Sequence, residues 1–364
     1  MISISGLLKS IPGILLCVVL AYLSVIISKF IGENILKIPK SPISPIIICI
    51  IFGIIVANFI KIPEKFLHGI SFSGKNILRI GIVLLGIRIS LPYILELSYS
   101  IIPIIIVSIS LSLVFCYFLS RLIGISPKMG TLIAVGTSIC GASAIVATSP
   151  VIDAKKEEVT YAIANITIFG IIAMICYPFF SYYIFEEDIT AAGIFLGTAI
   201  HETGQVAGAG IIYSEQFNSP EAMEVATVTK LVRNISMIIV IPLMSIIYFQ
   251  GEKNNKFERV PRFRSLIPLF IFGFLAMGTL RTVGDLSIQH YGSAFLFMTE
   301  TVWGKTIEFF RIFSEYSLAT AMAGIGLMTN LKSLRALGIK PFYVGFLSAI
   351  FMSVISYLSI MIII

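Results

Sequence analysis

The chain has 364 residues, of which 57% are hydrophobic and 12% are charged, and its formal net charge is +7. Soluble domains contain ~25% charged residues, so this composition excludes a soluble enzyme, a disordered segment, a coiled coil and a disulfide scaffold. The apolar residues form long continuous blocks, whereas a β-barrel alternates polar and apolar residues along short strands. We therefore predict an all-α polytopic membrane protein.

The excess of Lys and Arg is typical of a membrane protein. Cytoplasmic loops are rich in these residues, so we expect the basic loop 251–264 to face the cytoplasm. No compact basic domain with interleaved aromatic residues is present, and we predict no nucleic-acid partner. The five cysteines lie in apolar stretches without a CxxC pair, which predicts no disulfide framework and no zinc site. We expect no metal site and no cofactor.

Eleven apolar segments follow one another, each close to the ~20 residues that a helix needs to cross a bilayer. They cover residues 10–31, 43–60, 74–93, 99–123, 128–150, 157–184, 190–213, 220–249, 264–286, 303–330 and 338–362. We predict about 10 to 11 transmembrane helices in one membrane domain, residues 1–364. The first segment is interpreted as a retained helix, because no small-residue cleavage site follows its long apolar run.

An internal repeat is expected, because transporters are often built from inverted halves. With 10–31 set aside as an extra N-terminal helix, residues 43–184 can be laid on residues 190–362 as two five-helix repeats. This alignment places the small-residue run 136–144 opposite the small-residue run 317–326.

The strongest local motif is GTSICGASA at residues 136–144, inside a segment unusually rich in glycine and hydroxyl side chains. Glycines allow a helix to unwind, and the freed N–H groups and hydroxyls then form an anion site near the bilayer midplane. The alternative is close helix packing through small residues. The candidate substrate-binding residues here are Gly136, Thr137, Ser138, Cys140, Gly141 and Ser143.

A second polar motif, HETGQ, lies in the glycine-rich segment 190–213 and contains His201, Glu202 and Gln205. Ionisable groups at membrane depth usually mark a pathway or a proton relay. Zinc ligation is disfavoured, because Gln205 replaces the second His of the H-E-x-x-H pattern. The remaining alternative is a polar lock between helices. Whether 128–150 and 190–213 cross the membrane or are re-entrant stays open.

Lys230 and Arg233 are candidate anion partners, since Arg presents a planar fork to oxyanions. The alternative is that their charges extend to the membrane interface, which is the favoured interpretation for Arg88. Arg79 and Arg88 fall on roughly opposite faces of a helix, so they cannot both serve one site.

Several catalytic patterns are missing from the sequence. It contains no G-x-x-x-x-G-K-[ST] loop and no G-x-S-x-G elbow, which argues against ATP hydrolysis and esterase chemistry. Glu202 is the one good candidate for an intramembrane carboxylate. Transport by this chain would therefore be secondary, and we expect no enzyme activity.

In this order, GTSICGASAIVATSPVI, IFGIIAMICYP, AIHETGQVAGAG and VTKLVR resemble the sulfate exporter family of YeiH-type bacterial inner-membrane proteins. The resemblance covers nearly the whole chain. It implies a multi-pass plasma-membrane protein distantly akin to the cation:proton antiporter and anion transporter group, with two inverted repeats and crossed, broken helices. On that implication, 128–150 and 303–330 are the broken pair.

The leading hypothesis is a secondary transporter that moves a small anion, such as sulfate or a related oxyanion or sulfonate, by alternating access. The alternative is a cation- or proton-coupled carrier of another small solute, with Glu202 and His201 holding a proton or sodium ion. An intramembrane metal-dependent enzyme and a non-transporting scaffold or sensor are further alternatives. The expected partners are the anion, a coupling ion, the lipid bilayer and a second copy in a homodimer.

Overall fold

The computed structural model describes residues 4–37, 43–186, 188–248, 268–329 and 338–364. Over these ranges the chain is mostly helical, with short turns and connecting segments between the helices and one β-bridge between Ala294 and Met298. The prediction of an all-α membrane fold is confirmed, and each of the eleven apolar segments contains helix. The basic loop 251–264 lies outside the described residues.

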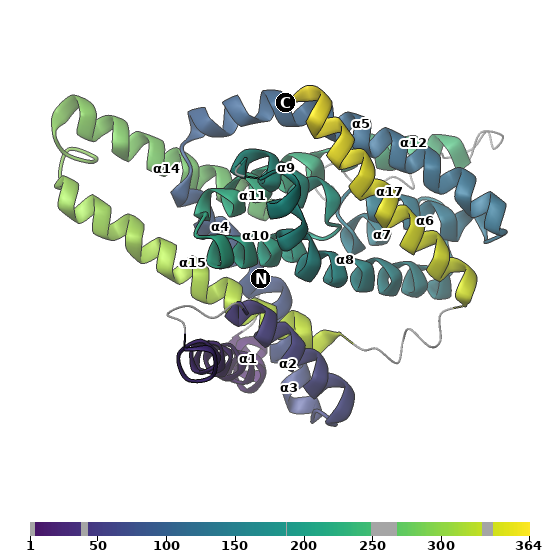
Figure 1. The fold of residues 1–364 in the computed structure, drawn as a ribbon, viewed down its shortest axis with the longest axis horizontal. Helices are drawn as coiled ribbons and strands as arrows, with labels where there is room; N and C mark the ends of the chain where they lie inside the picture. The colour runs from purple at the N-terminus through teal and green to yellow at the C-terminus, as the bar shows by residue number, and fades with distance from the viewer. Residues whose placement is uncertain (1–3, 38–42, 187, 249–267, 330–337) are drawn as a thin grey trace. The chain divides into compact units, whose positions relative to one another are not determined.

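The helices follow one another along the chain as Figure 1 labels them. The long ones are α1 (Ile4–Phe30), α2 (Pro45–Phe59), α5 (Leu91–Ile123), α8 (Lys156–Ile184), α10 (Thr203–Phe217), α11 (Pro220–Ile235), α14 (Leu269–Tyr291), α15 (Glu300–Met328) and α17 (Ile339–Ile363). The shorter ones are α3 (Glu64–Phe72), α4 (Leu78–Leu85), α6 (Pro127–Ser138), α7 (Ala142–Thr148), α9 (Ile189–Ala199) and α12 (Met237–Tyr248). The single turns η1 (Ile31–Leu36), η2 (Ser73–Ile77) and η3 (Gly86–Arg88) extend or join them.

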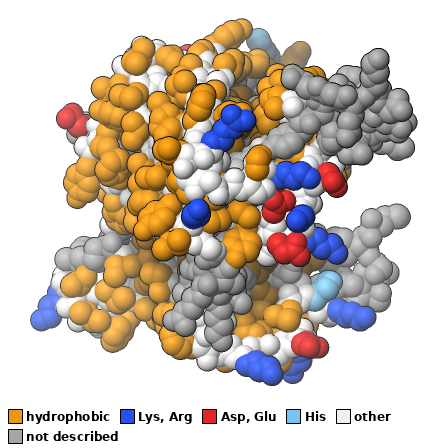
Figure 2. All heavy atoms as spheres, turned by 90° about the vertical axis from the view of Figure 1, so that its right-hand side faces the viewer, with side chains coloured by type: hydrophobic (Ala, Val, Ile, Leu, Met, Phe, Trp, Pro, Cys, Tyr) orange, Lys and Arg blue, Asp and Glu red, His pale blue; other side chains and the backbone are white. Residues whose placement is uncertain are grey.

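Seven helical stretches among the described residues are long and apolar enough to cross a membrane. Glu64–Arg88 is one of them, so the helix begins earlier than the predicted segment 74–93. The remaining apolar segments are α2, the two interrupted stretches α6–α7 and α9–α10, and α15. Hydrophobic side chains cover much of the visible surface, and few charged side chains stand among them (Figure 2), as expected of a protein with lipid as its solvent.

The chain forms two compact units. Unit 1 comprises Met1–Leu95, Ser214–Pro220 and Leu269–Leu331, and unit 2 comprises Glu96–Tyr213, Glu221–Pro268 and Lys332–Ile364. Both units draw on both halves of the chain, so their boundaries differ from the proposed repeats 43–184 and 190–362. That pair of repeats stays a prediction.

The expectation that 303–330 contains a break is wrong, because α15 continues without interruption from Glu300 to Met328. Its small-residue run serves close packing within unit 1 instead. A Cβ on Gly326 would lie 2.6 Å from the Ile50 carbonyl oxygen of α2, and one on Gly324 would lie 2.7 Å from the Gly74 nitrogen. Alanine favours helix, and glycine allows helices to approach closely. The small residues here are therefore compatible with a continuous α15 that packs tightly on its neighbours.

Unit 1 also contains the arginine expected at a membrane interface. Arg88 instead pairs with Glu315 of α15 at 3.4 Å, and 7% of the Arg88 side chain is exposed. Arg311 lies 3.8 Å from the same carboxylate. α15 carries Glu308, Arg311 and Glu315 along its length and is not among the seven described stretches that are apolar enough to cross a membrane.

Unit 2 contains the two interrupted stretches and the helices that hold them. α17 packs on α6, α8 and α9. The Asn165 amide of α8 donates to the Pro341 carbonyl at 2.7 Å, and Asn165 occupies the space where a side chain of Gly345 would be. α8 is thereby tied to α17, and it also packs on α6, α7 and α9 of the interrupted stretches.

The crossing of α1 and α3 in unit 1 provides a stability test. A Cβ on Gly69 would lie 2.6 Å from the Gly13 Cα atom, inside van der Waals contact. Gly69→Ala is therefore expected to lower the free energy of unfolding by about 1–3 kcal/mol.

Gly304→Ala on α15 is the matched control, because a Cβ there meets nothing within 4 Å. Alanine should stabilise that exposed helical position by roughly 0.5–1 kcal/mol. Thermal unfolding of the purified proteins in detergent measures both changes. Equal melting temperatures for the two variants would contradict the close approach of α1 and α3.

Candidate functional site

Two helices of unit 2 are interrupted near their middles. α6 ends at Ser138 and α7 begins at Ala142, while α9 ends at Ala199 and α10 begins at Thr203. Gly141 has φ +70° and ψ −130°, a conformation that favours glycine. Each interruption leaves the last carbonyls of the preceding helix without partners in their own helix.

The two interruptions have related sequences. Gly136-Thr-Ser-Ile precedes the first and Gly197-Thr-Ala-Ile precedes the second. The predicted pairing of residues 136–144 with 317–326 therefore overlooks the better match. The recurring G-T-x-I pattern is the signal that could have identified the true second break.

Arg233 of α11 is fully buried and donates to carbonyls of both interrupted helices. Its Nε donates to the Ser138 carbonyl at 2.8 Å, and its Nη2 to the Thr137 carbonyl. Its Nη1 donates to the carbonyls of Thr198 and, at 3.1 Å, Ile200. Every nitrogen of the guanidinium therefore has a backbone partner.

Lys230 lies one turn earlier on the same face of α11 and is also fully buried. Its Nζ donates to the carbonyls of Ile139 at 2.9 Å, Ile200 at 2.8 Å and His201. Three donated bonds require three hydrogens, so these contacts are those of a charged ammonium group. The two cations thus bind the carbonyl ends of both α6 and α9.

These contacts have a clear electrostatic basis. The carbonyl end of a helix carries about half a negative charge, and cations nearby are stabilised. An unpaired carbonyl inside a membrane protein costs several kcal/mol. Direct pairing of Arg233 or Lys230 with an anion stays a prediction, and a ligand would have to compete with these carbonyls for the same donors.

Glu202 lies in the second interruption, directly before α10, and contacts the first interruption. Its Oε1 accepts a hydrogen bond from the Ala142 N–H at 3.2 Å, and its own N–H donates to Gln205 Oε1 at 3.0 Å. Gln205 Nε2 in turn donates to the Thr167 carbonyl of α8 at 3.1 Å. Glu202 is half-buried, so it is more accessible than the two cations.

Two glycines make room for these side chains. A Cβ on Gly141 would collide with Glu202 Cγ, and a Cβ on Gly170 of α8 would collide with the Gln205 amide. The glycine of the first motif is thus needed both for its backbone angles and for the neighbouring carboxylate.

Several buried polar groups at the interruptions have no hydrogen-bond partner among the described residues. They are Thr137 Oγ1, Ser138 Oγ, both ring nitrogens of His201, and Asn234 Oδ1. By contrast, the buried hydroxyls of Thr198, Thr227 and Thr229 each donate to a carbonyl one turn earlier in their own helices. Eight further buried polar atoms elsewhere in the described residues also have no partner. The group at the interruptions differs from them by lying beside two buried cations, and it is therefore the candidate ligand site.

The other predicted site residues lie nearby in different settings. Cys140 is buried with its Sγ 3.2 Å from Met237 Sδ, and Gly136 lies against Ile145 and Ile166. Ser143 is exposed on α7. Asn234, which donates to Thr203 Oγ1 at 3.1 Å, was missed because one amide in an apolar helix carries no motif. No three His, Cys, Asp or Glu side chains in the described part of the chain are grouped as a metal site requires.

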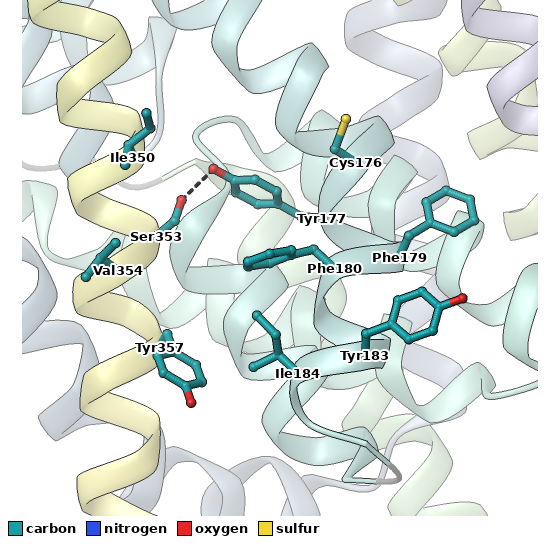
Figure 3. Close-up of a pocket in the computed structure, with 10 residues that line it drawn as sticks. All are labelled: Cys176, Tyr177, Phe179, Phe180, Tyr183, Ile184, Ile350, Ser353, Val354 and Tyr357. Carbon is teal, nitrogen blue, oxygen red and sulfur yellow. Dashed lines mark hydrogen bonds between the residues drawn. The ribbon is translucent and has the colours of Figure 1, made fainter.

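A separate groove of about 770 Å³ lies between α8 and α17 (Figure 3). Tyr177, Phe180 and Tyr183 line one side, and Ser353 and Tyr357 line the other. The Tyr177 hydroxyl and Ser353 Oγ are 2.5 Å apart. The lining contains no charged residue, so the groove has no counter-charge for an ionic ligand.

The fold defines a multi-pass α-helical membrane protein with a polar site built from two interrupted helices. The chain belongs to the family described as conserved hypothetical protein 698, which matches residues 12–345. The family resemblance seen in the sequence is thus confirmed, and the chain is a multi-pass protein of the bacterial plasma membrane.

Similar proteins include UPF0324 membrane proteins from several bacteria. The one from Fusobacterium nucleatum is 33% identical over 92% of this chain and 92% of its own length. One from Streptococcus agalactiae is 31% identical over 93% of this chain and 92% of its own length. A solved structure, the sodium proton antiporter MjNhaP1 from Methanocaldococcus jannaschii, matches over 98% of this chain and 99% of the antiporter with 12% identity and a TM-score of 0.28. That score is too low to carry the antiporter's activity to this chain.

The buried cations are expected to be essential for folding. Lys230→Met would leave the carbonyls of Ile139, Ile200 and His201 without their shared donor. Removing one partner from a buried charged contact costs about 3–5 kcal/mol, and Arg233→Met should cost at least as much.

Arg121→Met is the control, since Arg121 is exposed on α5 with its guanidinium 4.6 Å from the Tyr117 ring centroid. Losing this cation–π contact should lower the free energy of unfolding by no more than about 0.5–1 kcal/mol. Thermal unfolding in detergent compares the three variants. If Lys230→Met were as stable as Arg121→Met, the cations would not be holding the interrupted helices together.

Proposed function

We propose that this protein is a secondary carrier of a small anion, with its binding site at the two helix interruptions of unit 2. The observation that carries the proposal is the group of fully buried, unpartnered polar side chains beside two buried cations. Thr137 and Ser138 supply hydroxyl hydrogens, and His201 supplies a ring N–H. Donors of this kind bind anions, and the adjacent positive charges favour them further.

Interrupted helices are suited to transport because they place polar backbone within the membrane without exposing it to lipid. Lys230 and Arg233 satisfy the carbonyl ends, which leaves the hydroxyls and the imidazole for the ligand. Alternating access would expose this site first to one side of the membrane and then to the other. Glu202 is accessible enough to exchange a proton with water. It would couple the movement of that proton to the movement of the anion.

A second candidate is a carrier that binds a sodium ion or a proton at Glu202 and moves another small solute. The observation that favours it is the half-buried position of Glu202, whose Oε1 accepts one N–H at 3.2 Å. A carboxylate with remaining acceptor capacity can bind a cation.

Uptake by reconstituted protein tests the first proposal. Proteoliposomes should accumulate labelled chloride, nitrate or sulfate down an imposed gradient, and uptake of at least one of these should depend on the protein. Thr137→Val combined with Ser138→Ala should lower its initial rate at least about tenfold, because a hydrogen bond to a charged ligand contributes about 1.5–3 kcal/mol. Thr227→Val is the control, since its hydroxyl donates to the Met223 carbonyl at 2.7 Å.

Glu202→Gln separates the two candidates. In an anion carrier coupled through Glu202, this variant should still take up the anion but should lose its response to an imposed pH gradient. Anion uptake equal to that of empty liposomes would overturn the first proposal. Sodium- or proton-driven uptake of a neutral solute, abolished by Glu202→Gln, would establish the second.

A further inference from the structure

We infer that the ligand of this site is a small monovalent anion and not a dianion such as sulfate. The inference rests on the proposed function and depends on two independent properties of the site. One is the balance of charge around the interruptions, and the other is the number of donors that remain unoccupied.

The side chains with a formal charge that contact the interruptions are Lys230, Arg233 and Glu202. The three hydrogen bonds of Lys230 are those of an ammonium, and a guanidinium stays charged in proteins. The two cations with one carboxylate carry a surplus of one formal positive charge.

The helix ends modify this surplus only slightly. The carbonyl ends of α6 and α9, of 12 and 11 residues, together contribute roughly one negative charge beside the cations. The amino ends of α10 and α7 face Glu202 and contribute roughly half to one positive charge. A positive balance of roughly half to one charge remains, which one monovalent anion neutralises and a dianion exceeds.

The donors lead to the same conclusion. A tetrahedral dianion has four oxygens and is usually bound by an arginine fork or by many N–H groups. Here every guanidinium nitrogen and all three ammonium hydrogens already donate to backbone carbonyls. The remaining donors include the hydroxyls of Thr137 and Ser138, one ring N–H of His201 and one N–H of Arg233 Nη2. No complete arginine fork is left for a dianion, and single donors of this kind suit a halide or a small planar anion.

The site is also closely enclosed. Thr137 and Ser138 are 0% exposed and His201 is 1% exposed, so a bound ion would lose its water shell. Desolvation is far more costly for a doubly charged ion than for a singly charged one. The enclosure therefore adds to the preference for a monovalent anion that the charge balance predicts.

Thermal unfolding of the full chain in detergent tests this selectivity. Chloride, nitrate and formate are compared with sulfate and thiosulfate at constant ionic strength, with sodium gluconate as the background. A ligand that binds the native state raises the melting temperature by mass action. We expect at least one of the small monovalent ions to bind at least about tenfold more tightly than sulfate. Thr137→Val should abolish that shift, whereas Thr227→Val should retain it.

A charge substitution provides the decisive comparison. Glu202→Gln removes one negative charge from the site, so it should improve sulfate binding relative to chloride or nitrate. Glu221→Gln makes the same change at an exposed position of α11 and should leave the ratio unchanged.

The outcomes distinguish the inference from the proposed function. Stronger stabilisation by sulfate than by any monovalent ion, abolished by Thr137→Val, would overturn the inference and leave the anion carrier intact. If Thr137→Val retained the shift of every anion that stabilises the chain, or if no anion stabilised it, both would be overturned. A monovalent preference that depends on Thr137 and is reduced by Glu202→Gln would support the inference.

Discussion

The contact on which this structure depends is between two buried cations of α11 and the carbonyl ends of two interrupted helices. Interrupting a helix inside a membrane leaves carbonyl groups that lipid cannot solvate. Lys230 and Arg233 supply N–H groups to both sets of carbonyls, and no smaller or neutral side chain has enough donors to do so. The same two residues of α11 therefore stabilise both interruptions.

The same contact decides what remains for a ligand. Arginine and lysine in a membrane protein suggest direct binding of an anion, but here most of their N–H groups donate to backbone carbonyls. In the proposed site the ligand would instead meet weaker donors, the hydroxyls of Thr137 and Ser138 and the ring of His201, within the positive potential of the cations. This separation of charge from direct contact would favour weak, reversible binding, which a carrier requires.

Close packing between helices places the remaining polar groups. Gly141 and Gly170 leave space for Glu202 and Gln205, so a carboxylate and an amide fit where any larger residue would exclude them. In unit 1, Gly326 and Gly324 give α15 the same closeness to its neighbours, yet that helix stays continuous. A run of small residues can therefore form either an interrupted helix or a continuous one. Which of the two forms depends on the helices packed against it.

Composition and apolar block lengths alone determined the membrane class, the eleven helical segments and the two polar motifs, because each depends on properties local in the chain. The location of the second break could not be decided this way, since 317–326 and 197–202 are both rich in small residues. A buried cation can stabilise an interrupted α-helix by binding its freed carbonyls. Only the tertiary structure shows that Lys230 and Arg233 bind the carbonyl of Ile200, whereas α15 stays uninterrupted. The role of the cations was hidden for the same reason, because backbone carbonyls are identical at every residue and a sequence does not show which of them a side chain will meet.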